Sequence, residues 1–248
     1  MQKNQEVPSR LLGVLGGMGP LATVDFLGKL VAETPGRRDA DHVPVVVYSV
    51  PQIPSRPQAI LAGGPSPLPA MLAGMRTLRE AGAQIIAMPC NTAHYWYDEL
   101  TREGGVPIIH IADATAAEIA ALGAPGIVGI LGTDATVAVR LFEKRLEPCG
   151  LRCIAPSARE LEELVLPAIE CVKRHDLETG HRLALRACES LRRAGAEAIV
   201  LGCTELPVAV EYSPSDIAAH CVDPTRALAR ACVRWWHQVQ PHADVSRR

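Results

Sequence analysis

Residues 78–90 read LREAGAQIIAMPC and residues 191–203 read LRRAGAEAIVLGC, with seven of the thirteen positions identical and no gap. In each copy a helical segment runs into Ala-Gly-Ala, an apolar strand follows, and a cysteine comes at the carboxyl end of that strand. The repeat therefore places Cys90 and Cys203 at matched positions, 113 residues apart. Internal duplication at this scale predicts two similar α/β lobes that carry one thiol each.

Shorter echoes extend the repeat. GVLGG at residues 13–17 is matched by GILGT at residues 129–133, and each motif ends an apolar strand and opens a helix. IAD at residues 111–113 and VDP at residues 222–224 look like a third matched pair. The duplication thus covers most of the chain.

Short apolar segments alternate with helical segments along both halves, a pattern typical of parallel sheets covered on both faces. The predicted strands are 11–15, 43–50, 84–88, 108–111, 126–131, 153–155, 198–201 and 220–222. The helices predicted after the two glycine motifs are 21–32 and 135–146. The expected fold class is α/β, with two similar pseudo-symmetric lobes, each a mainly parallel sheet flanked by helices.

The expected domain boundaries follow from the repeat. Residues 1–112 form the first lobe, with Cys90, and residues 113–223 form the second lobe, with Cys203. Residues 224–248 hold a C-terminal helix that packs back on the body. Because open parallel sheets bind ligands outside the carboxyl ends of their strands, both thiols fall at the ligand edge. We therefore expect the active site between the lobes.

Composition excludes several classes of protein. The net charge of −2 and the absence of a basic block argue against a nucleic-acid partner. The first ten residues are polar, unlike a secretory signal, and no apolar run approaches the ~20 residues of a membrane span. We expect a cytoplasmic protein with neither a nucleic-acid nor a membrane partner.

The eight cysteines fit neither a disulfide framework nor a structural zinc site. Cys149 and Cys153 are separated by three residues, and no second pair completes a tetrahedron. Four others lie in apolar segments and are predicted to be buried free thiols. These four are Cys171, Cys188, Cys221 and Cys232.

The turn GMGPLA at residues 17–22 matches the loose dinucleotide pattern G-x-G-x-x-G/A. A dinucleotide site also needs an acidic residue at the end of the second strand, and here that strand runs into Pro51-Gln52. We interpret the turn instead as a helix N-terminus that favours an anion such as a substrate carboxylate.

The proline-rich segment 51–69 has two interpretations. It follows a strand at the ligand edge and could close over the site, or it is a passive surface loop.

His94 also has two interpretations. It could serve Cys90 as the base of a Cys–His hydrolase, but a histidine four residues after the cysteine is more often structural. Pyridoxal phosphate is not expected, because none of the four lysines lies in an obvious phosphate cradle.

Two matched thiols suit a reaction that treats both faces of one carbon alike. Racemisation at Cα removes a proton from one face and returns a proton to the other, so one thiolate acts as base and the opposite thiol as acid. A helix N-terminus or a nearby cation increases the thiolate fraction. The negative charge that develops needs donors aimed at the α-carboxylate, and Asn91, Thr92 and Thr204 follow the thiols closely enough to supply them.

At these residues the chain resembles the cofactor-independent aspartate/glutamate racemase superfamily, most closely its aspartate racemase branch. The resemblance covers nearly the whole length. Its signatures are LGGMGP at 15–20, PQIPSR at 51–56, MPCNTAH at 88–94 and GCTEL at 202–206. It implies two α/β lobes with the site between them, usually in a homodimer, and neither pyridoxal phosphate nor a metal.

The resemblance also implies residue roles. Cys90 and Cys203 match the two catalytic cysteines, Arg56 matches the cation that holds the side-chain carboxylate, and Lys173 matches a second cation. Further positions match residues that line the substrate site. They are Met18, Gln52, Asn91, Thr92, Thr204 and Glu205.

The expected activity is racemisation of aspartate, with glutamate or a broader set of amino acids as further substrates. Two alternatives stay open. A maleate-type isomerase would use a cysteine as a nucleophile, and a non-catalytic protein would close its lobes on a small dicarboxylate.

Overall fold

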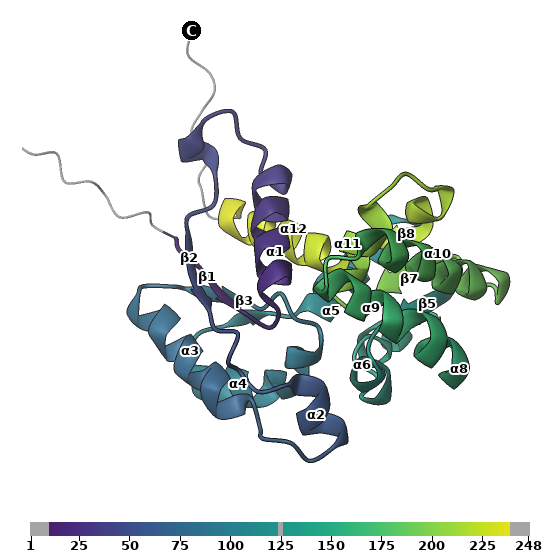
Figure 1. Cartoon of the computed structure of the whole chain (residues 1–248). Coiled ribbons are helices and arrows are strands. Elements are labelled where there is room, and N and C mark those ends of the chain that lie inside the picture. Colours follow the sequence, from purple (N-terminus) through teal and green to yellow (C-terminus); the bar gives the residue numbers. More distant parts are fainter. Residues whose placement is uncertain (1–9, 124–125, 239–248) are drawn as a thin grey trace, which may run out of the picture.

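The computed structural model describes residues 10–123 and 126–238 and contains two lobes, each built on a four-stranded parallel sheet (Figure 1). The strand order is β2-β1-β3-β4 in the first lobe and β6-β5-β7-β8 in the second. Adding four to each strand number of the first order gives the second order, so the two sheets have the same topology. The predicted α/β class with two similar lobes is confirmed.

Every predicted strand is present, and all but 198–201 have shifted ends. The first sheet consists of β1 (Leu12–Gly16), β2 (Val45–Ser49), β3 (Ile85–Ala87) and β4 (Ile108–Ile109). The second consists of β5 (Ile127–Leu131), β6 (Arg152–Ile154), β7 (Ala198–Leu201) and β8 (Cys221–Val222). Strands β1, β3 and β7 are buried at every residue, as expected for the centre of a sheet covered on both faces.

Helices cover both sheets. The first lobe has α1 (Pro20–Glu33), α2 (Arg56–Leu61), α3 (Leu68–Glu80), α4 (Tyr97–Gly104) and the 3-10 turns Asp39–Asp41 and Thr92–Trp96. After β4 come α5 (Ile111–Ala121), α6 (Asp134–Ala138), α7 (Glu143–Leu146), a 3-10 turn at Glu147–Cys149, and α8 (Ala158–Glu160). A π-helical turn at Leu161–Val165 leads into α9 (Leu166–Lys173), followed by α10 (Leu177–Arg193), α11 (Glu205–Glu211), a 3-10 turn at Asp216–His220 and α12 (Pro224–His237).

The continuous helix predicted over 135–146 is wrong. The chain forms the separate helices α6 and α7 there, and Arg140 between them has a φ of 52°. A left-handed residue cannot continue a right-handed helix, so the chain turns at this point. The segment 51–69 is also more ordered than a loop, because it contains α2 and the start of α3.

The third matched pair is displaced by two residues from its predicted alignment. Ile86 pairs with Ile108 and Ile199 pairs with Cys221, so the spacing of 113 residues persists through the last strands. Ile109 therefore corresponds to Val222, and His110 to Asp223. The prediction was wrong because β4 ends at Ile109, two residues earlier than its apolar sequence suggests.

The helices that follow the last strands cross between the lobes. On α12, Leu228, Cys232 and Trp236 belong to the buried cluster of β1 and α1 in the first lobe. On α5, Ala112 and Ile119 belong to a buried cluster of the second lobe, and α5 packs against α12. The division into 1–112, 113–223 and 224–248 stays a prediction, and residues 1–9 and 239–248 of it lie outside the described residues.

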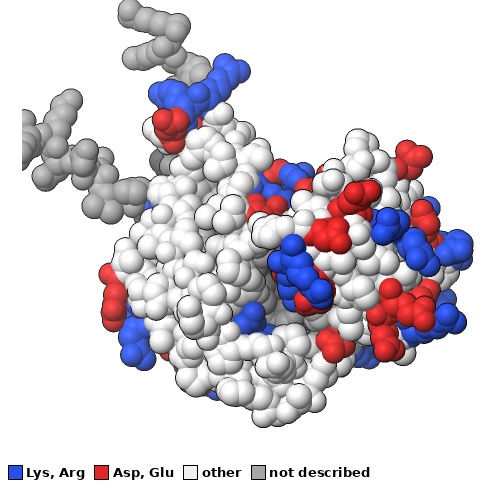
Figure 2. Space-filling view, viewed as in Figure 1, with Lys and Arg blue, Asp and Glu red and all other residues white. Residues whose placement is uncertain are grey.

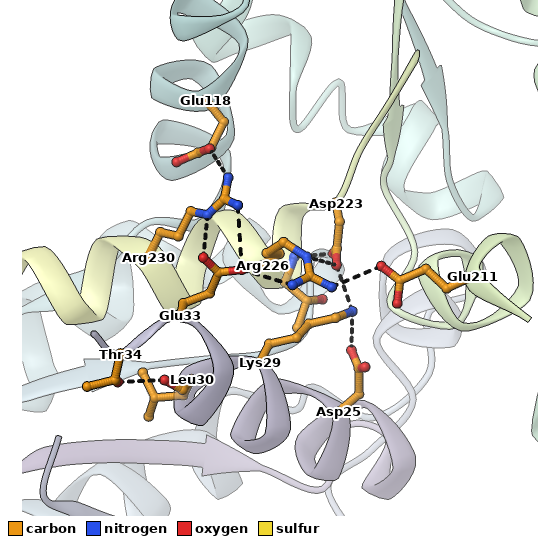
Figure 3. Close-up of polar contacts among 11 residues, drawn as sticks. Asp25, Lys29, Leu30, Glu33, Thr34, Glu118, Glu211, Asp223, Arg226 and Arg230 are labelled. Atoms are coloured by element: carbon orange, nitrogen blue, oxygen red, sulfur yellow. Dashed lines mark hydrogen bonds and ion pairs between the residues drawn. The ribbon is translucent and has the colours of Figure 1, made fainter. Parts of the chain in front are cut away.

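A charged cluster joins α1 to the second lobe (Figure 3). Lys29 is only 5% exposed and lies 2.6 Å from both Asp25 and Asp223. Arg226 on α12 pairs with Glu33 of α1 at 2.8 Å and Glu211 of α11 at 3.1 Å. Removal of one member of a buried ion pair costs about 3–5 kcal/mol, because the remaining charge lacks a partner. The cluster thus fixes how the lobes meet.

No helix in the described part of the chain combines the length and the apolar character that a membrane span needs.

Candidate active site

A cavity of about 780 Å³ opens between the lobes, at the carboxyl ends of the strands. Figure 2 shows the molecule hollowed between the two lobes, with mostly uncharged atoms on the first lobe. Nine of the ten predicted site residues line the cavity. They are Met18, Arg56, Cys90, Asn91, Thr92, Lys173, Cys203, Thr204 and Glu205. Gln52 does not line it; its side chain is exposed, and its neighbours Pro51 and Ile53 form the wall instead.

Cys90 is held at the cavity wall by its backbone. Buried strand β3 ends three residues earlier, and the Cys90 carbonyl accepts a hydrogen bond from His94 Nδ1 at 3.0 Å. The other ring nitrogen, Nε2, accepts from the N–H of Ile111 at 3.2 Å. Burial lowers the pKa of His94 to about 4, so the ring is neutral near pH 7. Both ring nitrogens of His94 therefore form hydrogen bonds with main-chain groups, and neither bonds to the Cys90 thiol.

The Cys90 thiol lies beside a cation. Burial raises its pKa, and the guanidinium of Arg56 and the backbone N–H of Ala93 act in the opposite direction. The cation therefore offsets part of the cost of forming a buried thiolate.

Arg56 is fixed by backbone groups. Its Nη1 donates to the carbonyls of Ile53 at 2.9 Å and Pro54 at 2.7 Å, and its Nη2 donates to that of Met18 at 3.1 Å. The Nε atom is buried and has no partner. The charge is thus held in one position, and the Nε–H remains without a partner.

The Cys203 thiol lies beside an anion. It is 9% exposed, and its Sγ donates to Glu205 Oε2 at 3.0 Å. Thr204 Oγ1 donates to the same oxygen at 3.2 Å. Burial and the Glu205 carboxylate raise the Cys203 pKa well above its usual value, although Lys173 and the Glu205 N–H act the other way. Cys203 is therefore held as a protonated thiol.

Lys173 reaches the cavity from the end of α9. Its Nζ pairs with Glu170 at 2.8 Å, and the side chain is half exposed. Burial lowers its pKa, but the bond to Glu170 and the charge of Glu205 outweigh burial and raise it. Lys173 is therefore a charged group at the rim.

The amide of Asn91 is a buried polar group in the cavity wall. Asn91 is 3% exposed, and neither its Nδ2 nor its Oδ1 has a hydrogen-bond partner. A buried amide without partners costs about 1–3 kcal/mol, so the cavity is suited to a molecule that supplies a donor and an acceptor.

The lobes come close at two points in the site. Thr92 Oγ1 lies 3.0 Å from Thr136 Oγ1, which joins the segment after Cys90 to α6. A Cβ built on Gly19 would lie 3.7 Å from Glu205 Oε1. Gly19 precedes α1 and gives that helix no side-chain cap. The first turn of α1 thus has no N-cap side chain at the cavity wall, and the interpretation of this turn as an anion site stays a prediction.

Sequence reasoning missed several wall residues. Thr133 ends the repeated GILGT motif and corresponds to Gly17, so the repeat itself could have indicated it. Leu21 and Val24 on α1 make part of the wall apolar, and a helical pattern alone does not show which face meets a cavity. His175, with a φ of 63°, had no signal in the sequence.

Among residues 10–123 and 126–238, no group of three or more His, Cys, Asp or Glu side chains is arranged to hold a metal ion.

Comparisons with known proteins identify the family to which this chain is similar. The family model described as Asp/Glu/hydantoin racemase matches residues 15–232. The broad specificity amino-acid racemase RacX of Bacillus subtilis is 27% identical over 230 residues, covering 90% of this chain and 96% of the relative.

Solved structures give the same result. The aspartate racemase of Picrophilus torridus superposes with a TM-score of 0.81 at 30% identity, covering 92% of this chain and 94% of the other. An aspartate racemase homologue from Pyrococcus horikoshii has a TM-score of 0.74 at 26% identity, covering 92% and 100%.

Proposed function

The chain belongs to the Asp/Glu/hydantoin racemase family and is an amino-acid racemase, and from this premise we propose that it racemises aspartate with Cys90 and Cys203 as opposed acid and base, without a cofactor. The observation that carries the proposal is the cavity itself. Two cysteines from matched strands of two lobes line it together, beside an amide that has no partner.

The surroundings of the thiols suggest their resting roles. Burial raises the pKa of Cys90 and Arg56 offsets part of this rise, whereas burial and Glu205 together keep the proton on Cys203. In one direction Cys90 removes the Cα proton and Cys203 delivers its proton to the opposite face. The other enantiomer requires the reverse assignment, with Cys203 as base and Cys90 as acid.

The negative charge that develops on the substrate carboxylate needs donors. The N–H groups in the first turn of α1, which has no side-chain cap, and the unpartnered amide of Asn91 would serve as these donors. Donors that are already fixed stabilise the transition state without reorganisation at the moment of reaction. Roles for Arg56, Lys173, Thr92 and Thr204 in holding the substrate belong to the same proposal.

Aspartate is the first substrate to test, and glutamate and neutral amino acids follow. The Picrophilus torridus relative is an aspartate racemase, while the Bacillus subtilis relative has broad specificity. Arg56 and Lys173 favour a second carboxylate, whereas Leu21 and Val24 provide an apolar wall. The cavity volume leaves room for side chains longer than that of aspartate.

Two further expectations belong to the proposal: a cytoplasmic location and a homodimer. The polar N-terminal sequence favours the first, and the family resemblance favours the second. Light scattering on the full chain tests the dimer, and a monomer at micromolar concentration would contradict it.

Proton NMR of L- and D-aspartate in D2O with purified protein and no added cofactor tests the activity. We expect the Cα proton signal to disappear from both enantiomers, with interconversion. Exchange from one enantiomer only would mean a single working base. No exchange with aspartate, glutamate or a panel of neutral amino acids would refute the proposed activity, and a covalent cysteine adduct with maleate would then indicate the isomerase.

A further inference from the structure

Two cysteines outside the cavity lie against each other in the second lobe. Cys188 Sγ on α10 is 3.9 Å from Cys221 Sγ at the start of β8, and both thiols are free. Of the four cysteines predicted to be buried, Cys188 and Cys232 are fully buried, whereas Cys171 and Cys221 are partly exposed. The racemase chemistry gives no role to the Cys188–Cys221 contact.

We propose that Cys188 and Cys221 form an oxidisable dithiol that closes to a disulfide in the native protein when it meets hydrogen peroxide. The sulfur atoms must approach from 3.9 Å to the disulfide length of about 2.05 Å. Cys221 is at the end of a 3-10 turn, at the first residue of a two-residue edge strand. Rotation and a small shift of this segment can provide the approach, whereas Cys188 is fixed in the middle of a 17-residue helix.

The unequal exposure of the two thiols sets the order of events. Cys221 is partly exposed and meets the oxidant first, while Cys188 is completely buried behind it. The contact with Cys221 and burial raise the pKa of Cys188, so Cys188 keeps its proton until its partner has reacted. An exposed attacking thiol with a resolving thiol beside it is the usual arrangement of a reversible redox pair.

The reaction balances in two steps. The Cys221 sulfur attacks one peroxide oxygen, the O–O bond breaks, and the thiol proton leaves with the second oxygen as water, which gives a sulfenic acid. The Cys188 sulfur then displaces the hydroxyl from Cys221, and the Cys188 proton leaves with it as a second water. Two thiols lose two electrons in total, and the peroxide accepts them.

A disulfide between Cys188 and Cys221 would restrict the segment of the chain that carries Cys203. Cys188 and Cys221 are 33 positions apart, and the loop between them contains β7, Cys203 and α11. The disulfide would therefore tie together the two ends of the segment that carries Cys203. A crosslink across a loop of this length restricts the unfolded chain, so the oxidised protein should melt at a higher temperature by roughly 5–10 °C.

The test uses the full chain with Cys203→Ser, because trypsin then leaves Cys188 in peptide 187–192 and Cys221 as the sole cysteine of peptide 194–226. The folded protein is treated with hydrogen peroxide, its remaining thiols are blocked, and it is digested without reductant. We expect the two peptides to be joined, with two hydrogens lost, and to separate after reduction. Cys188→Ala in the same background should abolish the joined peptide.

Two results would overturn the proposal. One is oxidation of Cys221 to sulfinic or sulfonic acid, or of exposed Cys149 alone, with Cys188 still a free thiol. The other is a joined protein that melts at or below the temperature of the reduced protein, because the bond would then not fit the native geometry. Neither result depends on racemase activity, so failure here is distinct from failure of the proposed function.

Discussion

The two lobes share one strand order and one matched thiol, yet they surround that thiol differently. Cys90 lies beside the guanidinium of Arg56, and Cys203 donates a hydrogen bond to the carboxylate of Glu205. The spacing of 113 residues pairs Glu205 with Thr92, which instead bonds to Thr136 across the lobes. A duplicated scaffold therefore supplies symmetric positions, and a few unmatched side chains make the two acid–base groups unequal.

A second contrast lies in the polar groups around the thiols. Asn91 has no partner, whereas its counterpart Thr204 bonds to Glu205. The helix after β1 has no side-chain cap, whereas Thr133 caps the helix after β5 by accepting from Thr136 N at 3.2 Å. The first lobe thus leaves polar groups at the cavity open to a ligand. The corresponding groups of the second lobe form hydrogen bonds within the protein.

The largest effect is expected from the thiols themselves. Cys90→Ala and Cys203→Ala should each lower racemisation of both aspartate enantiomers by about 10²–10⁴-fold, because each direction needs both an acid and a base. Activity is measured by polarimetry with purified variants. Exposed Cys149→Ala is the matched control and should keep full activity. If either variant kept more than roughly a tenth of the wild-type rate, the two-base mechanism would fail.

Asn91→Leu separates function from stability in the first lobe. The variant should lower kcat/KM by about 100-fold if the amide binds the transition state, while the free energy of unfolding stays equal or rises, since a buried polar group without partners disappears. Thr204→Val is the matched change in the second lobe and should lower stability, because it removes a hydrogen bond. Urea unfolding and steady-state kinetics on both variants measure the difference. Equal losses of stability in Asn91→Leu and Thr204→Val would contradict this difference between the lobes.

Arg56 and Glu205 should change the reactivity of their thiols in opposite directions. Arg56→Met should slow alkylation of Cys90 by iodoacetamide at pH 7.5 several-fold, and Glu205→Gln should accelerate alkylation of Cys203 several-fold, because each variant removes the charge beside its thiol. Mass spectrometry follows each site, with Cys149 as the internal reference. Arg56→Lys keeps the charge and should retain most of the Cys90 rate. If both alkylation rates rose, or both fell, the proposed difference between the charges beside Cys90 and Cys203 would be wrong.

Two buried histidines of the first lobe should make the stability of the protein depend on pH. Burial lowers the pKa of His94 to about 4 and of His110 to about 2, so the unfolded chain binds protons that the native state does not. Stability should be full above pH 6.5 and fall as the pH drops, by about 2 kcal/mol per histidine at pH 5. Urea unfolding at pH 7.5 and 5 measures the fall.

His110→Asn is the control for this pH dependence. His110 Nδ1 caps α5 by accepting from Ala112 N, and asparagine can cap a helix while removing the titration. The matched positions in the second lobe are Pro207 and Asp223, so the second lobe has no histidine at either place. A variant with the same pH dependence as the wild type would show that His110 is not responsible.

The sequence determined the parts of this protein that local patterns encode. The repeat predicted two parallel α/β lobes and put Cys90 and Cys203 at equivalent strand ends, because a strand's carboxyl edge follows from its apolar run and the turn after it. The motifs also led to nine residues of the cavity wall. The break at Arg140 and the early end of β4 were not predictable, since helix and strand ends depend on tertiary contacts as well as on local preference.

Only the tertiary structure decided how the two halves work together. The crossing of α5 and α12, the ion pairs of Lys29 and Arg226, and the exposure of Gln52 depend on contacts between residues far apart in the chain. The different charges beside the two thiols arise in the same way. A sequence repeat shows that two positions are equivalent in the backbone, but the proton affinity of a thiol depends on burial and on charges within a few ångströms, which packing alone brings together.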